Sequence, residues 1–358
     1  MFRELTDIKD HDIITAIEPV FQILDADLNR GGYNLGVVHG GGSFALIVAA
    51  SLGIFSASGE KYPMQMRTFC LCVLTATSFI LGEASYAQTP TSGFEFLPGG
   101  GIFLPPLAYY HEARTGVRGE LGTTRLKVDI GSTLDILEYR PDAGVDSRWR
   151  LGAEFFVYAL TTSYAGNRLQ VDATDGFFGG HIVWRNDFAA HRLDLRFRII
   201  HLSSHMVDGH YDTDAGIWLD GREPIPFTRD FGELTLAWSR ALGELTMRLY
   251  LGVSYSTLVR PSTLKRWGSI QGIELTSGSL LGRALGKPVT AFLAYNLTLE
   301  GIPEYIGTNN VEGGVKFGSW EGAGVRLYVS YVAGQQMFCQ YYDQRTRQWG
   351  IGFTLDVF

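Results

Sequence analysis

A histidine and a serine two residues apart, His201 and Ser203, are the side chains whose types and spacing best suit chemistry. Side chains at positions i and i+2 of a β-strand point to the same face. An imidazole beside a serine hydroxyl can remove its proton and make the oxygen a nucleophile that attacks an ester. One hypothesis is therefore a serine esterase with Ser203 as nucleophile and His201 as base. The carboxylate that orients the histidine would be Asp208 or Asp212.

The same cluster also has a structural interpretation. Histidine and serine at a strand end can mark the boundary between lipid tails and headgroups, where both side chains hydrogen-bond to water and phosphate. The other histidines show no paired spacing typical of metal ligands. The triplet Gly40-Gly41-Gly42 is not followed by the Lys-Ser/Thr of a phosphate loop. The sequence therefore predicts no metal and no cofactor.

The elements that would position these residues are strands whose apolar side chains repeat every two residues. The segments are about ten residues long, which is the length of a tilted strand that crosses a bilayer. We predict twelve strands, at 114–121, 125–138, 148–160, 174–185, 191–202, 229–239, 244–257, 267–276, 288–300, 309–318, 323–333 and 348–358. An even number suits a bacterial single-chain, up-and-down antiparallel β-barrel, and ten or fourteen strands stay open because residues 88–121 and 334–347 are ambiguous.

Charged residues in the middle of these strands indicate a polar lumen, because a charge that faces lipid near the bilayer centre costs about 2 to 4 kcal/mol. The predicted lumen residues are Arg196, Arg198, Arg248, Glu300, Lys316 and Arg326. Acids such as Glu233, Glu154 or Asp194 are the expected partners of the first two arginines. Alternation along the same strand then places His201, Ser203 and His205 on the outer, lipid-facing surface.

The ends of the strands indicate the orientation of the barrel. Tryptophans suit the membrane interface, and near the predicted strand ends stand Trp149, Trp184, Trp238, Trp267 and Trp349. The chain closes on an alternating strand with a terminal aromatic residue, which resembles the assembly signal of bacterial outer-membrane barrels. If this last strand ends in the periplasm, the connections near Asn186, Leu242 and Trp320 are periplasmic. Segments 203–228 and 334–347 then lie outside the cell, with His201 and Ser203 at the extracellular rim.

A secretory signal is predicted inside the chain, at residues 64–87. Arg67 precedes an apolar run from Phe69 to Leu81, and the small residues Ser85 and Ala87 precede the expected cut. Residues 1–63 are then a gene start placed too early, and residues 88–113 lead into the barrel or plug it. A buried helix is the alternative interpretation of the apolar run.

Composition narrows the class of protein. The chain has 358 residues, 19% of them charged, and a net charge of −7, which argues against nucleic-acid binding and disorder. The apolar stretches Ser43 to Ala57 and Phe69 to Leu81 are shorter than the roughly 20 residues of a spanning helix. We expect a monomer whose partners are outer-membrane lipids and, during biogenesis, the barrel-assembly machinery. Mature protein would keep only Cys339, so no internal disulfide is expected.

Three segments carry a family resemblance: residues 96–108, residues 196–205, which end in His-Leu-Ser-Ser-His, and the region of Gly334-Gln335 and Gln340-Tyr-Tyr342. Together they resemble domain-of-unknown-function family 1207, a family of bacterial outer-membrane proteins, over most of 94–358. The resemblance implies a location and a barrel fold, and no particular activity. In that family Gly-Asp-Glu tends to follow the motif, whereas here Met206-Val-Asp-Gly-His210 follows. The His-x-Ser pair also resembles the lipid-facing motif of outer-membrane phospholipase and lipid A deacylase barrels, where Asn usually stands in place of Ser204.

Two functions follow as hypotheses. The first is a barrel without a catalytic task, which serves as a narrow channel, surface receptor or structural element. The second is a lipid-acyl hydrolase of the outer leaflet that uses Ser203 and His201. A secreted soluble β-sandwich is the rival fold, because its strands alternate in the same way.

Overall fold

The computed structural model describes residues 92–141, 146–164, 168–188, 190–219, 221–278, 280–301 and 304–357. The predicted signal at 64–87, the segment 1–63 and the terminal Phe358 lie outside these residues.

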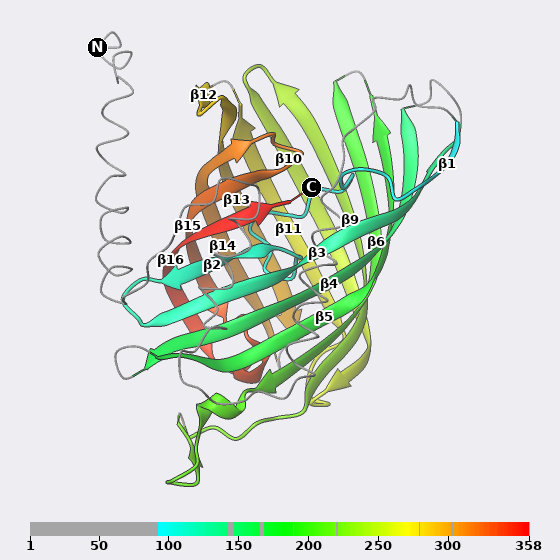
Figure 1. Cartoon of the computed structure of the whole chain (residues 1–358). Coiled ribbons are helices and arrows are strands. Elements are labelled where there is room, and N and C mark those ends of the chain that lie inside the picture. The colour runs from blue at the N-terminus through cyan, green and yellow to red at the C-terminus, as the bar shows by residue number, and fades with distance from the viewer. Residues whose placement is uncertain are drawn as a thin grey trace, which may run out of the picture. The chain divides into compact units, whose positions relative to one another are not determined.

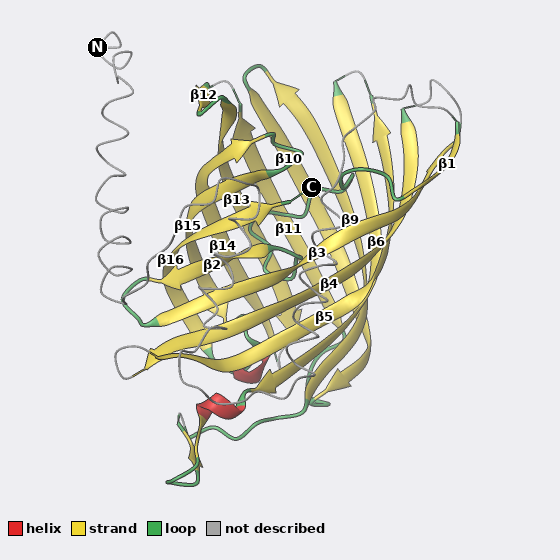
Figure 2. Cartoon of the chain, viewed as in Figure 1, coloured by secondary structure: helices red, strands yellow, loops and turns green. Residues whose placement is uncertain are grey.

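Twelve antiparallel strands form one closed barrel (Figures 1 and 2). They are β2 (Thr115–Glu120), β3 (Arg125–Arg140), β4 (Ser147–Tyr164), β5 (Arg168–Asp187), β6 (His191–Met206), β9 (Phe227–Leu242), β10 (Leu245–Arg260), β11 (Trp267–Ser277), β13 (Lys287–Gly301), β14 (Tyr305–Gly318), β15 (Gly324–Gln335) and β16 (Arg345–Asp356). The barrel closes where β16 pairs with β2, from Gly350 opposite Glu120 to Leu355 opposite Thr115. The predicted fold and strand number are confirmed, and the two-sheet sandwich is wrong because a single sheet closes on itself.

Short elements decorate the barrel. They are β1 (Gly93–Phe96), which pairs with β3; the hairpin of β7 (Tyr211–Asp212) and β8 (Ile217–Trp218); β12 (Arg283–Ala284), which pairs with β13; and the 3-10 turns η1 (Asp208–His210) and η2 (Cys339–Tyr341). Because β7 and β8 pair only with each other, β6 pairs directly with β9. Among the described residues no helix is long and apolar enough to span a membrane.

Alternation along the strands sorts apolar side chains outward and charged ones inward. Leu249 and Leu293 on the outer face are 39% and 53% exposed, whereas Arg248, which lies between the outward Met247 and Leu249, is buried. An outer wall of exposed aliphatic and aromatic side chains around a charged interior is the reverse of a water-soluble domain and typical of a membrane barrel.

The two ends of the barrel differ. The 203–228 and 334–347 segments, with η1, η2 and the β7–β8 hairpin, share one end, which we name the cap end (Figure 2). The turns after Asp187, Leu242 and Gly318 lie at the opposite end. At the cap end the Gln340 amide donates to the carbonyls of Ser204 and Ile225, at 2.8 Å each. Phe338 and Tyr341 add to a buried apolar cluster beneath these contacts.

Residues 97–114, which we name the inner segment, run between β1 and β2 through the lumen (Figure 1). Most of its second half is buried, and its backbone is held by side chains from several strands. Arg248 donates to the Leu104 carbonyl at 2.6 Å, and the Leu107 N–H donates to Glu274 at 2.7 Å. Asn310 donates to the Ala108 carbonyl at 2.5 Å. The lumen is therefore filled by chain where a porin would hold water.

Candidate active site

His201 lies on the outer face of β6, toward the cap end, and has a carboxylate partner. Its ring Nδ1 is 2.5 Å from Oδ1 of Asp230, which stands directly opposite on β9. The two side chains are 33% and 41% exposed, so the pair lies at the surface of the wall. The Phe178 ring packs against the imidazole with 4.7 Å between centroids. The contact with Asp230 orients the imidazole through Nδ1, so Nε2 is the ring nitrogen that could act on a neighbouring group.

Ser203 is the next outward residue of β6 after His201. Its neighbours across the sheet are Gly176 on β5 and Thr228 on β9. A Cβ at Gly176 would lie 3.9 Å from the Ser203 hydroxyl oxygen, so this glycine leaves one side of the hydroxyl free of side chain. The alternation predicted for His201 and Ser203 is what the strand adopts, and both project from the outer wall.

Of the two expected carboxylates, Asp212 does not contact His201 and the side chain of Asp208 is not described. Asp212 closes the β7–β8 turn, where its Oδ1 accepts hydrogen bonds from the N–H groups of Asp214 and Ala215 at 3.0 Å each. Asp230 takes the place instead because β9, and not the long segment after β6, is the neighbour of β6 in the sheet.

A serine, a histidine and an aspartate in this arrangement have the parts of a nucleophilic site. An aspartate on Nδ1 keeps the proton there and stabilises the imidazolium that forms when Nε2 takes the serine proton. Strand residues two apart are about 7 Å apart along the chain, and catalytic hydrogen bonds often tighten only once substrate binds. The adjacent Ser204 takes no part, because it points inward and donates to the buried Asp175.

The predicted lumen residues lie inside the barrel, where they form ion pairs. Arg198, fully buried, donates to Glu233 through Nε at 2.9 Å and approaches Glu154 at 3.3 Å. Arg196 donates to Glu112 of the inner segment at 2.8 Å. The others also pair: Arg248 with Glu274 at 3.1 Å, Glu300 with Arg229 at 3.1 Å, Lys316 with Asp356 at 2.7 Å and Arg326 with Asp356 at 2.9 Å.

Sequence reasoning missed Asp230, although a signal for it exists. The outward positions of β9 after it are Gly232, Leu234 and Leu236, so Asp230 is an acid in phase with lipid-facing residues. A carboxylate on that face needs a partner, and the only element that can supply one is a neighbouring strand. Among the described residues, no group of three or more His, Cys, Asp or Glu side chains is arranged to hold a metal ion.

The fold and the site together define a closed twelve-stranded β-barrel with a filled lumen and a Ser-His-Asp group on its outer wall. No family model and no curated protein sequence matches the chain, so the resemblance to family 1207 stays a prediction.

Solved structures of similar architecture exist. The β domain of the Bordetella autotransporter BrkA is 15% identical, with a TM-score of 0.39, over 68% of this chain and 97% of that one. Outer membrane phospholipase A from Escherichia coli is 13% identical, with a TM-score of 0.40, over 71% and 93%. OccAB1 from Acinetobacter baumannii is 10% identical, with a TM-score of 0.30, over 68% and 74%. Similarity at this level says nothing of activity.

Proposed function

We propose that this chain is an outer-membrane β-barrel that hydrolyses acyl esters of membrane lipids at the cell surface. The observation that carries the proposal is the hydrogen bond between His201 and Asp230 on the outer wall, next to Ser203. The nucleophile is Ser203, the base is His201, and Asp230 orients the base.

The reaction has two steps. The Ser203 oxygen attacks the ester carbonyl while His201 Nε2 takes the hydroxyl proton and passes it to the departing alcohol, which leaves an acyl-serine. Water then attacks the acyl-serine with His201 again as base, and a fatty acid and the free serine result. Asp230 stabilises the imidazolium in both steps and does not itself change protonation.

The place of Ser203, His201 and Asp230 on the barrel wall indicates which class of substrate they would meet. The wall around them carries exposed apolar side chains such as Phe178 and Ile199. Two tryptophan groups mark opposite ends of the barrel: Trp149 with Trp184, and Trp267 with Tyr255 near the cap end. Amphipathic rings at both ends suit the two membrane interfaces. With the cap end extracellular, His201 and Ser203 lie where the ester bonds of outer-leaflet lipids are found.

The test is fatty-acid release by purified, refolded protein in mixed micelles of phospholipid or lipid A. We expect release by the parent and near-complete loss in Ser203→Ala and His201→Ala. Ser132→Ala, which removes an outward serine from β3, is the matched control and should keep parent activity. A fluorophosphonate probe should attach to the Ser203 oxygen in the parent, with loss of fluoride, and the adduct should be seen by mass spectrometry. Equal release by all variants, or no release and no adduct, refutes the proposal.

A structural barrel without catalysis is the second candidate, and the filled lumen favours it. The ion pairs around Arg198 and the cap contacts of Gln340 stabilise the fold whether or not Ser203 reacts. This candidate predicts no adduct on Ser203 and no conductance in a planar bilayer.

A further inference from the structure

A row of outward side chains crosses three strands beside the proposed nucleophile. Ser203 of β6 stands opposite Thr228 of β9, and Thr228 stands opposite Arg260 of β10. Neighbouring strands lie about 4.8 Å apart, so the backbone of Arg260 is about 10 Å from that of Ser203 across the wall. Thr228, the residue of the row between them, is small, and its hydroxyl donates to the Leu202 carbonyl at 3.0 Å. The way along the wall from the serine to the arginine therefore crosses no bulky side chain of this row.

Three cations follow one another where β10 turns into β11. Arg260 ends β10, and Lys265 and Arg266 come directly before β11; all three are exposed, and residues 257–267 contain no acid. Arg266 donates to two backbone carbonyls of β10. The side chains of Arg260 and Lys265 form no hydrogen bond or ion pair with the described part of the chain.

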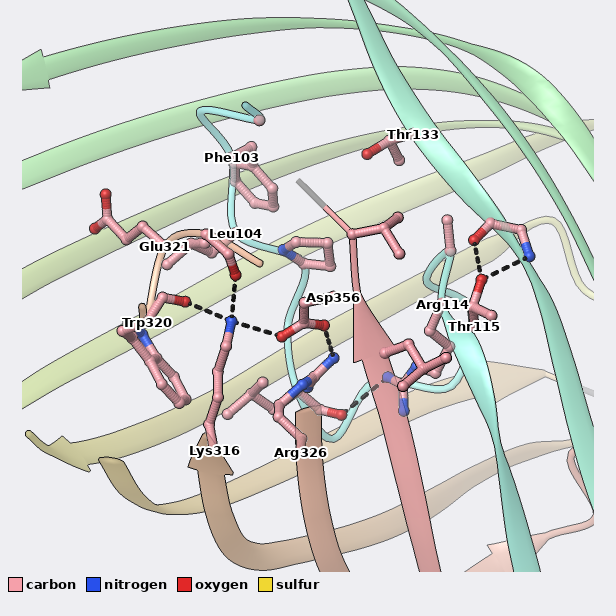
Figure 3. Close-up of a pocket in the computed structure, with 18 of the residues that line it drawn as sticks. Phe103, Leu104, Arg114, Thr115, Thr133, Lys316, Trp320, Glu321, Arg326 and Asp356 are labelled. Carbon is pink, nitrogen blue, oxygen red and sulfur yellow. Dashed lines mark hydrogen bonds and ion pairs between the residues drawn. The ribbon is translucent and has the colours of Figure 1, made fainter. Parts of the chain in front are cut away.

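Cations that line a pocket at the opposite end of the barrel are compensated within the protein. Lys316 and Arg326 share the carboxylate of Asp356 there, at 2.7 and 2.9 Å (Figure 3). The charged residues of that lining balance: Arg114, Lys316 and Arg326 against Glu274, Glu321 and Asp356. The pocket thus has no excess charge, in contrast to the β10–β11 turn.

Carboxylates near the β10–β11 turn do not compensate its cations. Asp230 stands opposite Leu258, two residues before Arg260, and is held by His201 at 2.5 Å. Glu304 lies in the turn after β13, and no ion pair joins it to the three cations within the described ranges. The turn therefore keeps an excess of positive charge that a counterion from outside the protein can meet.

An aromatic pair indicates how deep the turn lies in the membrane. The rings of Tyr255 and Trp267 are 4.9 Å apart, and both side chains are exposed. Such rings suit the level of the lipid headgroups, and Arg260 lies beyond them toward the cap end. In the other direction the outward side chains of β10 are apolar, with Val253 and Leu251 exposed. A lipid with its phosphate at the turn would thus have its acyl chains against an apolar wall.

We propose that Arg260, Lys265 and Arg266 bind the phosphate of an anionic lipid of the outer leaflet and thereby select the lipid whose ester reaches Ser203. Guanidinium and ammonium groups donate charge-assisted hydrogen bonds to phosphate oxygens, whereas a zwitterionic headgroup brings a cation of its own against the same three. In a lipid only a few bonds separate the phosphate from the acyl esters, so one molecule can meet both the cations and the serine. The selection rests on the proposed function, and the binding does not.

The experiment measures lipid binding to refolded Ser203→Ala protein in a non-ionic detergent, so that hydrolysis plays no part. The probe is phosphatidic acid with a dibrominated acyl chain, because bromine quenches indole fluorescence at contact. The Trp267 signal is the difference between proteins with and without Trp267→Phe. We expect saturable quenching, with an affinity about tenfold above that of phosphatidylcholine with the same chains, the value of one hydrogen bond to a charged group.

Variants of the unpaired cations test the contact. Arg260→Gln should weaken the binding of phosphatidic acid about tenfold, and Lys265→Gln added to it should remove the preference over phosphatidylcholine. Neither substitution removes a side-chain partner among the described residues, so both proteins should fold as the parent does. Arg260→Lys keeps the charge and should retain part of the preference. With Ser203 present, Arg260→Gln should raise KM for phosphatidic acid and leave kcat nearly unchanged.

Arg347→Gln is the matched control. Arg347 is an exposed cation at the cap end of β16, in phase with the outward Trp349 and several strands away from β10, so this variant should bind as the parent does. Displacement of the probe by unlabelled phosphatidic acid, and not by inorganic phosphate, supports a lipid as the occupant.

Three results overturn the binding proposal: equal quenching by the two lipids, equal affinities of Arg260→Gln and Arg347→Gln, or displacement by inorganic phosphate as effective as by lipid. Failure of the proposed function has a different signature. Protein with Ser203 then releases no fatty acid while Ser203→Ala still prefers phosphatidic acid, which overturns the selection of a substrate and supports the binding.

Discussion

Glu112 fastens the inner segment to the barrel wall, and replacing it tests whether that segment is part of the folded core. Its carboxylate is fully buried, accepts two hydrogen bonds from Arg196 and lies 3.7 Å from Arg198. Glu112→Ala leaves Arg196 with a 3.3 Å contact to Glu233 as its remaining ion pair among the described residues. The arginine stays buried because both its strand and the barrel around it are fixed.

The expected loss of stability in Glu112→Ala depends on the carboxylates that still pair with Arg196 and Arg198. Removing one partner of a buried ion pair costs about 3 to 5 kcal/mol, mainly because the other charge is left buried without compensation. Here Glu233 and Glu154 still face the two arginines, so we expect the low end, about 3 kcal/mol. Glu321→Gln is the control, since it breaks the more exposed pair with Arg192 and should cost no more than about 1 kcal/mol.

The assay is equilibrium unfolding in detergent or lipid, followed by tryptophan fluorescence, for the parent, Glu112→Ala, Arg196→Met and the double variant. The double variant removes both charges and should be clearly more stable than the sum of the single losses predicts. Planar-bilayer recording of Glu112→Ala shows in addition whether the loosened segment opens a conducting path. Additive losses, or a Glu112→Ala loss as small as that of Glu321→Gln, would show that the inner segment is not fastened through this pair.

Three further predictions concern the wall and the lumen. Asp230→Asn should lower kcat for fatty-acid release by about a hundredfold, the contribution of an oriented general base, and an unchanged kcat would remove Asp230 from the site. Leu293→Arg should cost about 2 to 4 kcal/mol of stability in lipid if this face meets the bilayer centre, whereas a near-neutral result in unfolding experiments would place the face in water. Burial lowers the pKa of His111, which lies in the inner segment and not in a strand, from 6.5 to about 4, against the opposing attraction of Glu300. Since the unfolded chain binds this proton at higher pH than the folded one, stability should fall as pH drops from about 6.5 toward 4, and His111→Gln should flatten that part of the denaturation-midpoint profile.

The barrel could be predicted from sequence because its rules are local. Alternation with period two places Leu249 and Arg248 on opposite faces of the sheet. The cost of a charge in hydrocarbon then predicts that the face with Leu249 is the outer one. Strand number follows from the same alternation once turns are counted. The course of residues 97–114 could not be derived in this way, because it depends on partners such as Glu274 and Asn310, more than 150 residues away in the chain.

The site shows the same division between local and distant information. His201 and Ser203 share a face because they share a strand, and two residues of spacing are enough to predict it. The partner of His201 depends on the register between β6 and β9, which are separated by the β7–β8 hairpin and its flanking loops. A long connection leaves register undetermined from sequence, so nearby acids such as Asp212 were reasonable candidates, whereas the carboxylate that contacts His201 is on the next strand of the sheet.

The filled lumen also bears on where this protein can act. Arg196, Arg198 and three carboxylates occupy the middle of the barrel, and the inner segment crosses it, so side chains and backbone fill this part of the lumen. The His201–Asp230 pair beside Ser203, near the cap end, is a place where polar side chains stand on the outer wall. A barrel whose rigid interior only holds its wall in register is well suited to work on lipids, since strands position side chains more accurately than loops do.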